Sequence, residues 1–289
     1  MGKAMDKINT PRVSVCIPVY NCEKYIAQAI GSVLAQTFQD WELVIDDNAS
    51  TDGTLNIIHQ FSDPRIHIIN NKMNIGLEAN WNKVVTAARG EYIKLLPADD
   101  FLYPLCLERQ VEIFESSENA SLALVGCARD IVDPDGKRLI VRKFPGREGK
   151  ISGILAIRTV LRSGTNLLGE PAAILFKRSL LEKAGLFDGS FAYVIDVDLW
   201  LRMLLHGDLY VLSNPYCGFR ISPGSTSVEL EGLQSRHFSA FINLKAKDPV
   251  YQVRWIDRQQ GIFTSMLLGL ARRLFYVYKV HNHRASGKR

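Results

Sequence analysis

Short β-branched runs alternate with helix-like apolar patterns over the first hundred residues of this 289-residue chain. The runs that predict strands lie at residues 13–17, 41–45, 65–69 and 91–96. Between them, apolar residues recur at helical spacing over 25–34, 55–61 and 77–89. Because parallel strands must be joined by crossovers, this alternation predicts an α/β fold whose mostly parallel sheet is covered by helices.

Polar clusters follow three of the four predicted strands. They occupy residues 18–21, 46–54 and 97–100. The carboxyl ends of parallel strands lie along one edge of a sheet, and ligands of open α/β sheets bind at that edge. The sequence therefore predicts that these three clusters meet in a ligand site.

The pattern is less regular after Pro104. Strands are predicted at 123–128 and 171–176, and a hairpin turn at 133–136. Residues 144–170 are rich in glycine and basic residues and have weak periodicity, so we expect a loop there. The spacing at 194–208 predicts a helix that begins near Asp196 and Asp198, where the helix dipole favours carboxylates.

The composition is that of an ordinary globular protein, with 47% apolar and 22% charged residues. The five cysteines show no Cys-x-x-Cys pair and no regular spacing, which argues against a zinc site and a disulfide framework. The first ten residues are polar and have no apolar stretch of signal-peptide length, so we expect a cytoplasmic protein.

Positive charge is concentrated near the C-terminus. Residues 236–289 contain eleven Lys and Arg against two Asp, a balance of +9, whereas the whole chain carries +5. The apolar run at 261–280 is interrupted by Arg272 and Arg273, so it is too short and too charged to span a bilayer. Two interpretations stay open: an amphipathic tail that contacts an anionic membrane surface, and a helix that packs on the domain or on a second subunit. The basic residues lack an ordered pattern of aromatic partners, so nucleic-acid binding is not expected.

Asp99 and Asp100 stand side by side directly after the fourth predicted strand. Adjacent carboxylates repel each other unless a cation lies beside them, and hard divalent ions such as Mg²⁺ or Mn²⁺ prefer oxygen ligands. Such an ion completes its coordination shell with waters and substrate phosphates, so the pair indicates a diphosphate substrate. The alternative is a pair of solvated turn residues that cap the helix after Pro104.

Four segments in this order and spacing resemble the family 2 glycosyltransferases, which have a GT-A fold. They are VSVCIPVYN, AIGSVLAQTFQDWELVIDDNASTDGT, GEYIKLLPADD and, more weakly, GEPAAILFKRSLLEKAGLFDGSFAYVIDVDLWLRM. The resemblance implies a Rossmann-like GT-A domain over 11–228, with a nucleotide-binding half at 11–104 and an acceptor-side half at 105–228. A helical, basic tail would then occupy 229–289.

Several residues match the family's nucleotide site. Tyr20 matches an aromatic that stacks on the base, although a rim or core aromatic is the alternative interpretation. Asp47 matches an acid that accepts hydrogen bonds from the base or ribose. Ser50 and Asp52 are expected to cap the following helix. The other nucleotide contacts that the resemblance implies are Pro18, Asn21, Asn74 and Asp99.

The resemblance also implies a metal ligand and a contact to the diphosphate. Asp100 matches the family's metal ligand, with Asp99 beside it toward the donor sugar. Family members often have a carboxylate where Pro97 stands, so two acids remain here. Arg220 resembles a basic residue near the diphosphate, although Ser222 stands where relatives often have His.

An inverting transfer needs a base that removes the proton from the attacking sugar hydroxyl. Asp196 matches the family's base, and Asp198 is the competing candidate. At a helix start, the two side chains should project in different directions. The Glu that usually precedes the base is replaced by Ile195. The alternative is that both acids only interact with the helix dipole.

Taken together, the resemblance implies an inverting, metal-dependent glycosyltransferase. It would move a sugar from a UDP, dTDP or GDP sugar to a glycan or lipid-linked acceptor, in bacterial cell-surface polysaccharide or lipid-linked glycan synthesis. The tail would contact the inner face of the membrane peripherally. One alternative is a catalytically inactive nucleotide-sugar-binding module, which the missing acid at Pro97 favours. Nucleotidyl transfer would want a Gly-rich phosphate loop after the first strand, and the sequence has none there.

Overall fold

The N-terminal half of the chain alternates strands and helices. The structure is a computed structural model that describes residues 10–222 and 233–286. The strands of this half are β1 (Val13–Val19), β2 (Trp41–Asp47), β3 (Ile66–Asn70) and β4 (Tyr92–Leu95). They pair in parallel in the order β3-β2-β1-β4, with Val13 of β1 opposite Trp41 of β2. The mostly parallel sheet predicted from the alternation is confirmed.

Helices cover both faces of this parallel sheet. They are α1 (Ile26–Leu34), α2 (Thr54–Ile58) and α3 (Leu77–Ala87). Successive residues of a strand point to opposite faces. Val15 therefore packs in the same cluster as Ile30 of α1, whereas Cys16 packs in the cluster that contains Val84 of α3. Burial from both sides holds the carboxyl end of β1 in place.

The sheet continues into a mixed C-terminal part. Its strands are β5 (Phe101–Leu102), β6 (Leu122–Val132), β7 (Arg138–Arg142), β8 (Gly149–Ile151), β9 (Ile174–Lys177) and β10 (Asp208–Arg220). β9 pairs antiparallel with both β4 and β6, and β10 lies parallel to β6. The predicted hairpin is confirmed, because β6 and β7 pair across a turn in which the Gly136 N–H donates to the Asp133 carbonyl. The helices of this part are α4 (Cys106–Glu115), α5 (Gly153–Ser163), α6 (Leu180–Ala184) and α7 (Ile195–Leu204).

The loop expected over 144–170 is wrong in its central part, which forms β8 and α5. Ser152 begins α5, since its hydroxyl accepts a hydrogen bond from the Leu155 N–H, and Gly164 ends it with a φ of 64°. The apolar face of α5 is buried in the core through Ala156, Ile157, Val160 and Leu161. The strand expected over 171–176 also starts later, because Pro171–Ala173 forms a 3₁₀ turn before β9.

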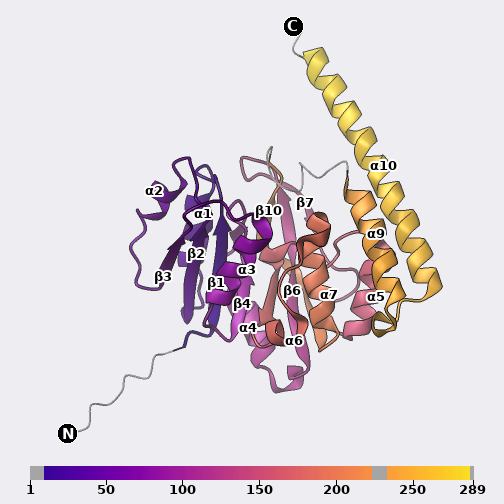
Figure 1. Cartoon of the computed structure of the whole chain (residues 1–289), viewed down its shortest axis with the longest axis horizontal. Coiled ribbons are helices and arrows are strands. Elements are labelled where there is room, and N and C mark those ends of the chain that lie inside the picture. The colour runs from indigo at the N-terminus through magenta and orange to yellow at the C-terminus, as the bar shows by residue number, and fades with distance from the viewer. Residues whose placement is uncertain (1–9, 223–232, 287–289) are drawn as a thin grey trace.

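Two helices end the described chain. α9 (Gln234–Lys247) buries Phe238, Phe241 and Ile242 in the core cluster that contains α7. α10 (Trp255–Ser286) packs on α9 and α5, and its C-terminal part extends past the body in Figure 1. The expected boundary between residues 228 and 229 lies outside the described residues. Within residues 10–222 and 233–286, no helix is long and apolar enough to cross a membrane.

Candidate functional site

A cavity of about 810 Å³ lies at the carboxyl edge of the parallel strands. All three polar clusters contribute to its wall, through 18–25 at and after the end of β1, Asn48 and Asp52 after β2, and 97–99 after β4. The C-terminal part supplies the other wall, including Asn166, Glu170, Tyr193 and Asp196. The predicted meeting of the clusters at one sheet edge is thus observed, and residues from both halves of the fold face the same space.

Pro18, Tyr20 and Asn21 line the cavity where β1 ends. The Tyr20 side chain is 47% exposed, so its ring is free to stack on a planar ligand. Asn21 has a positive φ of 48°, and its Oδ1 accepts a hydrogen bond from the Thr51 N–H. In return the Asn21 N–H donates to the Ser50 hydroxyl, which ties the loop after β1 to the loop after β2. Ser50 therefore joins two loops. The prediction that it caps α2 is wrong.

Asp47 is buried at the end of β2 and is not part of the cavity wall. Its Oδ2 accepts a hydrogen bond from the Ser50 N–H at 3.1 Å, whereas its Oδ1 has no partner among the described residues. The neighbouring Asp52 does line the cavity, and its Oδ1 accepts from the N–H of Thr54, the first residue of α2. Asp47 thus has one carboxylate oxygen without a described partner, and the next residue, Asn48, lines the cavity.

Amide side chains fix the loop that contains Asn74. The Asn48 Nδ2 donates to the Asn74 Oδ1 at 2.9 Å, and the Asn48 Oδ1 accepts from both Asn71 and the Ile75 N–H. Asn74 Oδ1 also accepts from the N–H of Gly76, whose φ of 87° suits glycine. Asn48 was not singled out in the sequence, because one amide in a polar loop carries no distinctive pattern. Both Asn48 and Asn74 line the cavity.

Asp99 and Asp100 differ in their surroundings. Asp99 lines the cavity, and burial raises the pKa of its carboxyl. Asp100 is almost fully buried, and burial together with the charge of Asp99 raises its pKa well above the ordinary value. The Asp100 Oδ1 accepts a hydrogen bond from the Arg220 N–H at 2.9 Å, and its Oδ2 has no partner in the described chain. The alternative of a solvated, capping pair is wrong, since Asp100 is buried and α4 begins at Cys106 without a side-chain cap.

Arg220 ends β10 and is buried. Its guanidinium donates to the carbonyls of Asp99, Asp133 and Pro134 and to the Gln28 Oε1. It also lies over the ring of Tyr25, 4.5 Å from the centroid. These contacts hold the acidic loop in place. Arg220 is not among the residues that line the cavity, so its contact with the diphosphate stays a prediction.

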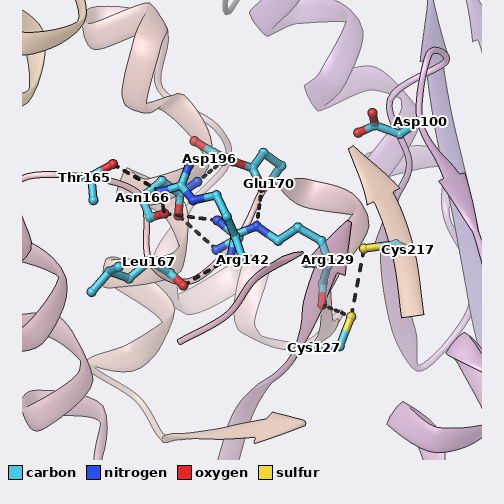
Figure 2. Close-up of polar contacts among 12 residues, drawn as sticks. Asp100, Cys127, Arg129, Arg142, Thr165, Asn166, Leu167, Glu170, Asp196 and Cys217 are labelled. Atoms are coloured by element: carbon cyan, nitrogen blue, oxygen red, sulfur yellow. Dashed lines mark hydrogen bonds and ion pairs between the residues drawn. The ribbon is translucent and has the colours of Figure 1, made fainter. Parts of the chain in front are cut away.

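Asp196 lies at the start of α7, on the cavity wall, and is 8% exposed (Figure 2). Its Oδ2 accepts a hydrogen bond from the Asn166 Nδ2 at 2.9 Å, and its Oδ1 accepts from the Val197 N–H. Burial, and then the charge of Glu170, raise the pKa of Asp196 to about 7. A carboxyl with this pKa can accept and release a proton at neutral pH.

A buried ion pair lies next to Asp196. The Arg129 Nε donates to the Glu170 Oε2 at 2.6 Å, and the Arg129 Nη2 donates to the Asn166 carbonyl (Figure 2). Burial opposes ionisation of Glu170, but the charges of Arg129 and Arg142 outweigh it and lower the pKa of Glu170. Glu170 thus remains an anion on the cavity wall beside Asp196. Sequence analysis did not single out Asn166, Glu170 or Arg129, because they lie in weakly patterned segments.

Asp198 points to a different neighbourhood from Asp196, as expected at a helix start. Its carboxylate pairs with the Arg202 Nε at 2.7 Å and with the Lys245 Nζ of α9 at 2.6 Å. It is absent from the cavity wall. Of the two acids, only Asp196 lines the cavity.

The described residues contain no group of three or more His, Cys, Asp or Glu side chains placed to hold a metal ion. The Asp100 Oδ2 is nonetheless a buried acceptor without a partner, next to Asp99 on the wall. Oxygen donors of this type suit Mg²⁺ or Mn²⁺ when waters and ligand phosphates supply the other positions. The two acids therefore fit a metal that binds together with a phosphorylated ligand.

Comparison with known proteins gives a consistent result. Residues 14–184 match the family described as glycosyl transferase family 2. EpsE of Bacillus subtilis (strain 168) is 35% identical over 204 residues, which make up 68% of this chain and 68% of EpsE. Hyaluronan synthase of Pasteurella multocida is 30% identical over 239 residues, which make up 81% of this chain and 23% of the synthase.

Solved structures share the fold. S. aureus TarS 1–349 in complex with UDP-GlcNAc has a TM-score of 0.62 and 20% identity, covering 78% of this chain and 66% of that one. The mannosyltransferase PcManGT of Pyrobaculum calidifontis, in complex with GDP-Man and Mn²⁺, has a TM-score of 0.59 and 17% identity. The match covers 96% of this chain and 80% of PcManGT. The predicted GT-A type α/β fold with C-terminal helices is therefore confirmed.

Proposed function

Since the chain belongs to glycosyl transferase family 2, we propose that it transfers a sugar from a nucleoside diphosphate sugar to an acceptor hydroxyl with inversion. The observation that carries this proposal is the Asp196 carboxyl. It lies on the wall of the cavity that Asp99 also lines, and its pKa is raised to about 7. One cavity thus offers a base and an acidic loop suited to a diphosphate.

The donor nucleoside would bind along the N-terminal half. Tyr20 would stack on the base, with Pro18 and Asn21 shaping the same loop and Asn74 contacting the nucleotide. Asp47 would accept a hydrogen bond from the base or ribose through its unpartnered Oδ1 only after the loop in front of it shifts, because the side chain is buried and does not line the cavity. UDP, dTDP and GDP are the candidate carriers, and the UDP-GlcNAc and GDP-Man complexes of the structural neighbours support this class.

Asp100, assisted by Asp99, would hold Mg²⁺ or Mn²⁺. When bound, this ion would neutralise charge on the leaving diphosphate. The chain's own contribution is to keep two carboxylates next to each other, which Arg220 does by binding the Asp99 carbonyl and the Asp100 Oδ1. The Mn²⁺ complex of PcManGT supports metal use here. Arg220 would reach the diphosphate only after giving up some of its carbonyl contacts.

Asp196 would act as the base. Its carboxylate would take the proton of the acceptor hydroxyl while that oxygen attacks the anomeric carbon and the bond to the diphosphate oxygen breaks. Asn166 keeps the carboxylate oriented by donating to Oδ2, and Glu170 offers a second anionic oxygen to acceptor hydroxyls.

The acceptor would be a glycan or a lipid-linked sugar at the cytoplasmic face of the membrane, in polysaccharide or lipid-linked glycan synthesis. The relationship to hyaluronan synthase supports a polysaccharide product. The basic balance of residues 236–289 supports peripheral contact with an anionic leaflet.

Turnover of the donor tests this proposal. Purified chain with Mn²⁺ and a panel of UDP, dTDP and GDP sugars should release the nucleoside diphosphate from one of them, slowly by hydrolysis and faster with an acceptor glycan. Asp196→Asn should reduce the transfer rate by at least a hundredfold, since general base catalysis contributes roughly 10²–10⁴. Asp198→Asn is the matched control and should stay within a few fold. Tight donor binding without release of nucleotide would instead favour the inactive sugar-nucleotide-binding module.

A further inference from the structure

The outer surface of α10 carries six large apolar side chains that are 54–71% exposed. They are Trp255, Ile256, Phe263, Met266, Leu267 and Leu270. At 100° per residue, the six positions fall within an arc of about 120° on one side of the helix. We call this surface the α10 apolar face. Gln259 also lies in this arc, between the first two and the last four of these side chains. Six large apolar side chains exposed on one side of a helix mark a contact surface rather than chance exposure of single residues.

The opposite side of α10 is packed on the body. Asp257, Gly261 and Ser265 are buried there. The Asp257 carboxylate pairs with Arg158, at 2.7 Å from its Nε, and with Arg162, both of α5. Gly261 lies so close to α5 that a Cβ would meet the Leu161 carbonyl oxygen at 2.0 Å. The α10 apolar face therefore points away from the domain, and α10 is the outermost helix on its side of Figure 1.

The charge around α10 decides between two occupants of this face. The sequence of residues 236–289 carries +9; within it, Lys245 is paired with Asp198, and Asp257 is paired with Arg158 and Arg162. A second copy of the chain would bring an equally basic segment against this one, and like charges repel. An anionic lipid surface is complementary, because basic residues gain energy near it while apolar side chains enter the boundary of the acyl chains.

We propose that the α10 apolar face lies flat on an anionic membrane surface, with the helix parallel to the bilayer. This inference rests on the proposed function, because it names the surface that makes the proposed membrane contact. The contact can nevertheless be measured without any transfer of sugar. In this arrangement the apolar face of α10 contacts the membrane, and its buried face packs on the domain. The domain would therefore keep one orientation relative to lipid-linked acceptors.

Vesicle flotation tests the inference on the full chain. The vesicles contain equal parts of phosphatidylglycerol and phosphatidylcholine, or phosphatidylcholine alone. The variant Phe263→Gln/Leu267→Gln should bind the anionic vesicles at least about tenfold more weakly than the unmodified chain, because two anchoring side chains become polar. The matched control is Leu139→Gln/Ile140→Gln on β7, where both side chains are 59% exposed, and it should bind normally. Binding of the unmodified chain should weaken at high salt and on neutral vesicles.

Asp196→Asn should float like the unmodified chain, so loss of catalysis and loss of membrane contact are distinguished. Thermal melting checks that each variant is folded, and Met266→Gln/Leu270→Gln replaces the first variant if that one melts early. Equal flotation of the α10 variant and the unmodified chain would overturn the inference. A second outcome would also overturn it: the unmodified chain does not float with vesicles, and light scattering finds a dimer that the α10 variant no longer forms. The face would then bind a second copy of the chain.

Discussion

At the scale of single residues, the protonation of Asp196 should control the pH dependence of transfer. Its pKa is raised to about 7, first by burial and then by Glu170. Only the deprotonated carboxyl can accept a proton, so the rate should rise with pH and level off about one unit above this value. Initial rates at low donor concentration, measured from pH 5.5 to 9, give the midpoint. A flat profile in this range would contradict the assignment of the base.

Two isosteric changes should move that midpoint in opposite directions. Asn166→Asp keeps the oxygen that accepts from the Gly169 N–H but places a second carboxylate against Asp196, which raises the pKa of Asp196. Glu170→Gln removes the charge that raises this pKa, so its midpoint should fall. We expect shifts of about one unit each way. A purely structural role for these residues would change the rate without separating the two midpoints.

The same carboxyl links stability to pH. An acid whose pKa is higher in the folded state than in the unfolded chain binds more protons when folded. Stability is therefore lost as the pH rises from the unfolded pKa, near 4, toward the folded pKa, near 7. This loss is the energetic consequence of burying a base at the cavity wall.

At the scale of elements, the contact between α10 and α5 depends on a glycine. Gly261→Ala would place a methyl group against the Leu161 carbonyl, so the helices must separate. Overpacking of this kind typically costs about 1–3 kcal/mol of unfolding free energy. Gly31→Ala in α1 is the matched control, because nothing lies within 4 Å of its added Cβ, and it should stabilise the chain by up to about 1 kcal/mol. Urea unfolding measures both, and an equal effect of the two changes would rule out the close contact.

Some helices, strands and site residues could be predicted from sequence patterns, and others could not. β1 and β2 are fully buried strands that the sequence shows as short β-branched or apolar runs, and α1 shows helical spacing of its apolar residues, so the positions of all three were predicted. α5 was missed because its basic residues and flanking glycines mask the buried face. In the site, Asp100 and Asp196 belong to recognisable motifs. Asn166 reaches Asp196 and Glu170 reaches Arg129 across 30 and 41 positions of the sequence, and no local pattern reports such contacts.

At the scale of the whole molecule, both halves of the fold line one cavity, so a donor that fills it should stabilise the entire chain. A ligand at a hundred times its Kd adds about 2.7 kcal/mol to the unfolding free energy. For a chain of this size, that corresponds to a rise in Tm of roughly 5 °C or more. We expect this rise with one of UDP, dTDP and GDP, and we expect it to depend on Mn²⁺ or Mg²⁺.

The change Asp100→Asn isolates the metal-dependent part of that stabilisation. The amide retains an oxygen that can accept from the Arg220 N–H, so the loop should keep its shape, but it removes the negative charge that a divalent ion requires. The increment in Tm that Mn²⁺ adds to the nucleotide should disappear, while the smaller shift with nucleotide alone persists. Asp40→Asn, at an exposed position before β2, is the control and should behave like the unmodified chain. A full Mn²⁺ increment in Asp100→Asn would mean that the ion is held by the nucleotide and Asp99 alone, and the role of Asp100 would reduce to fixing the loop through Arg220.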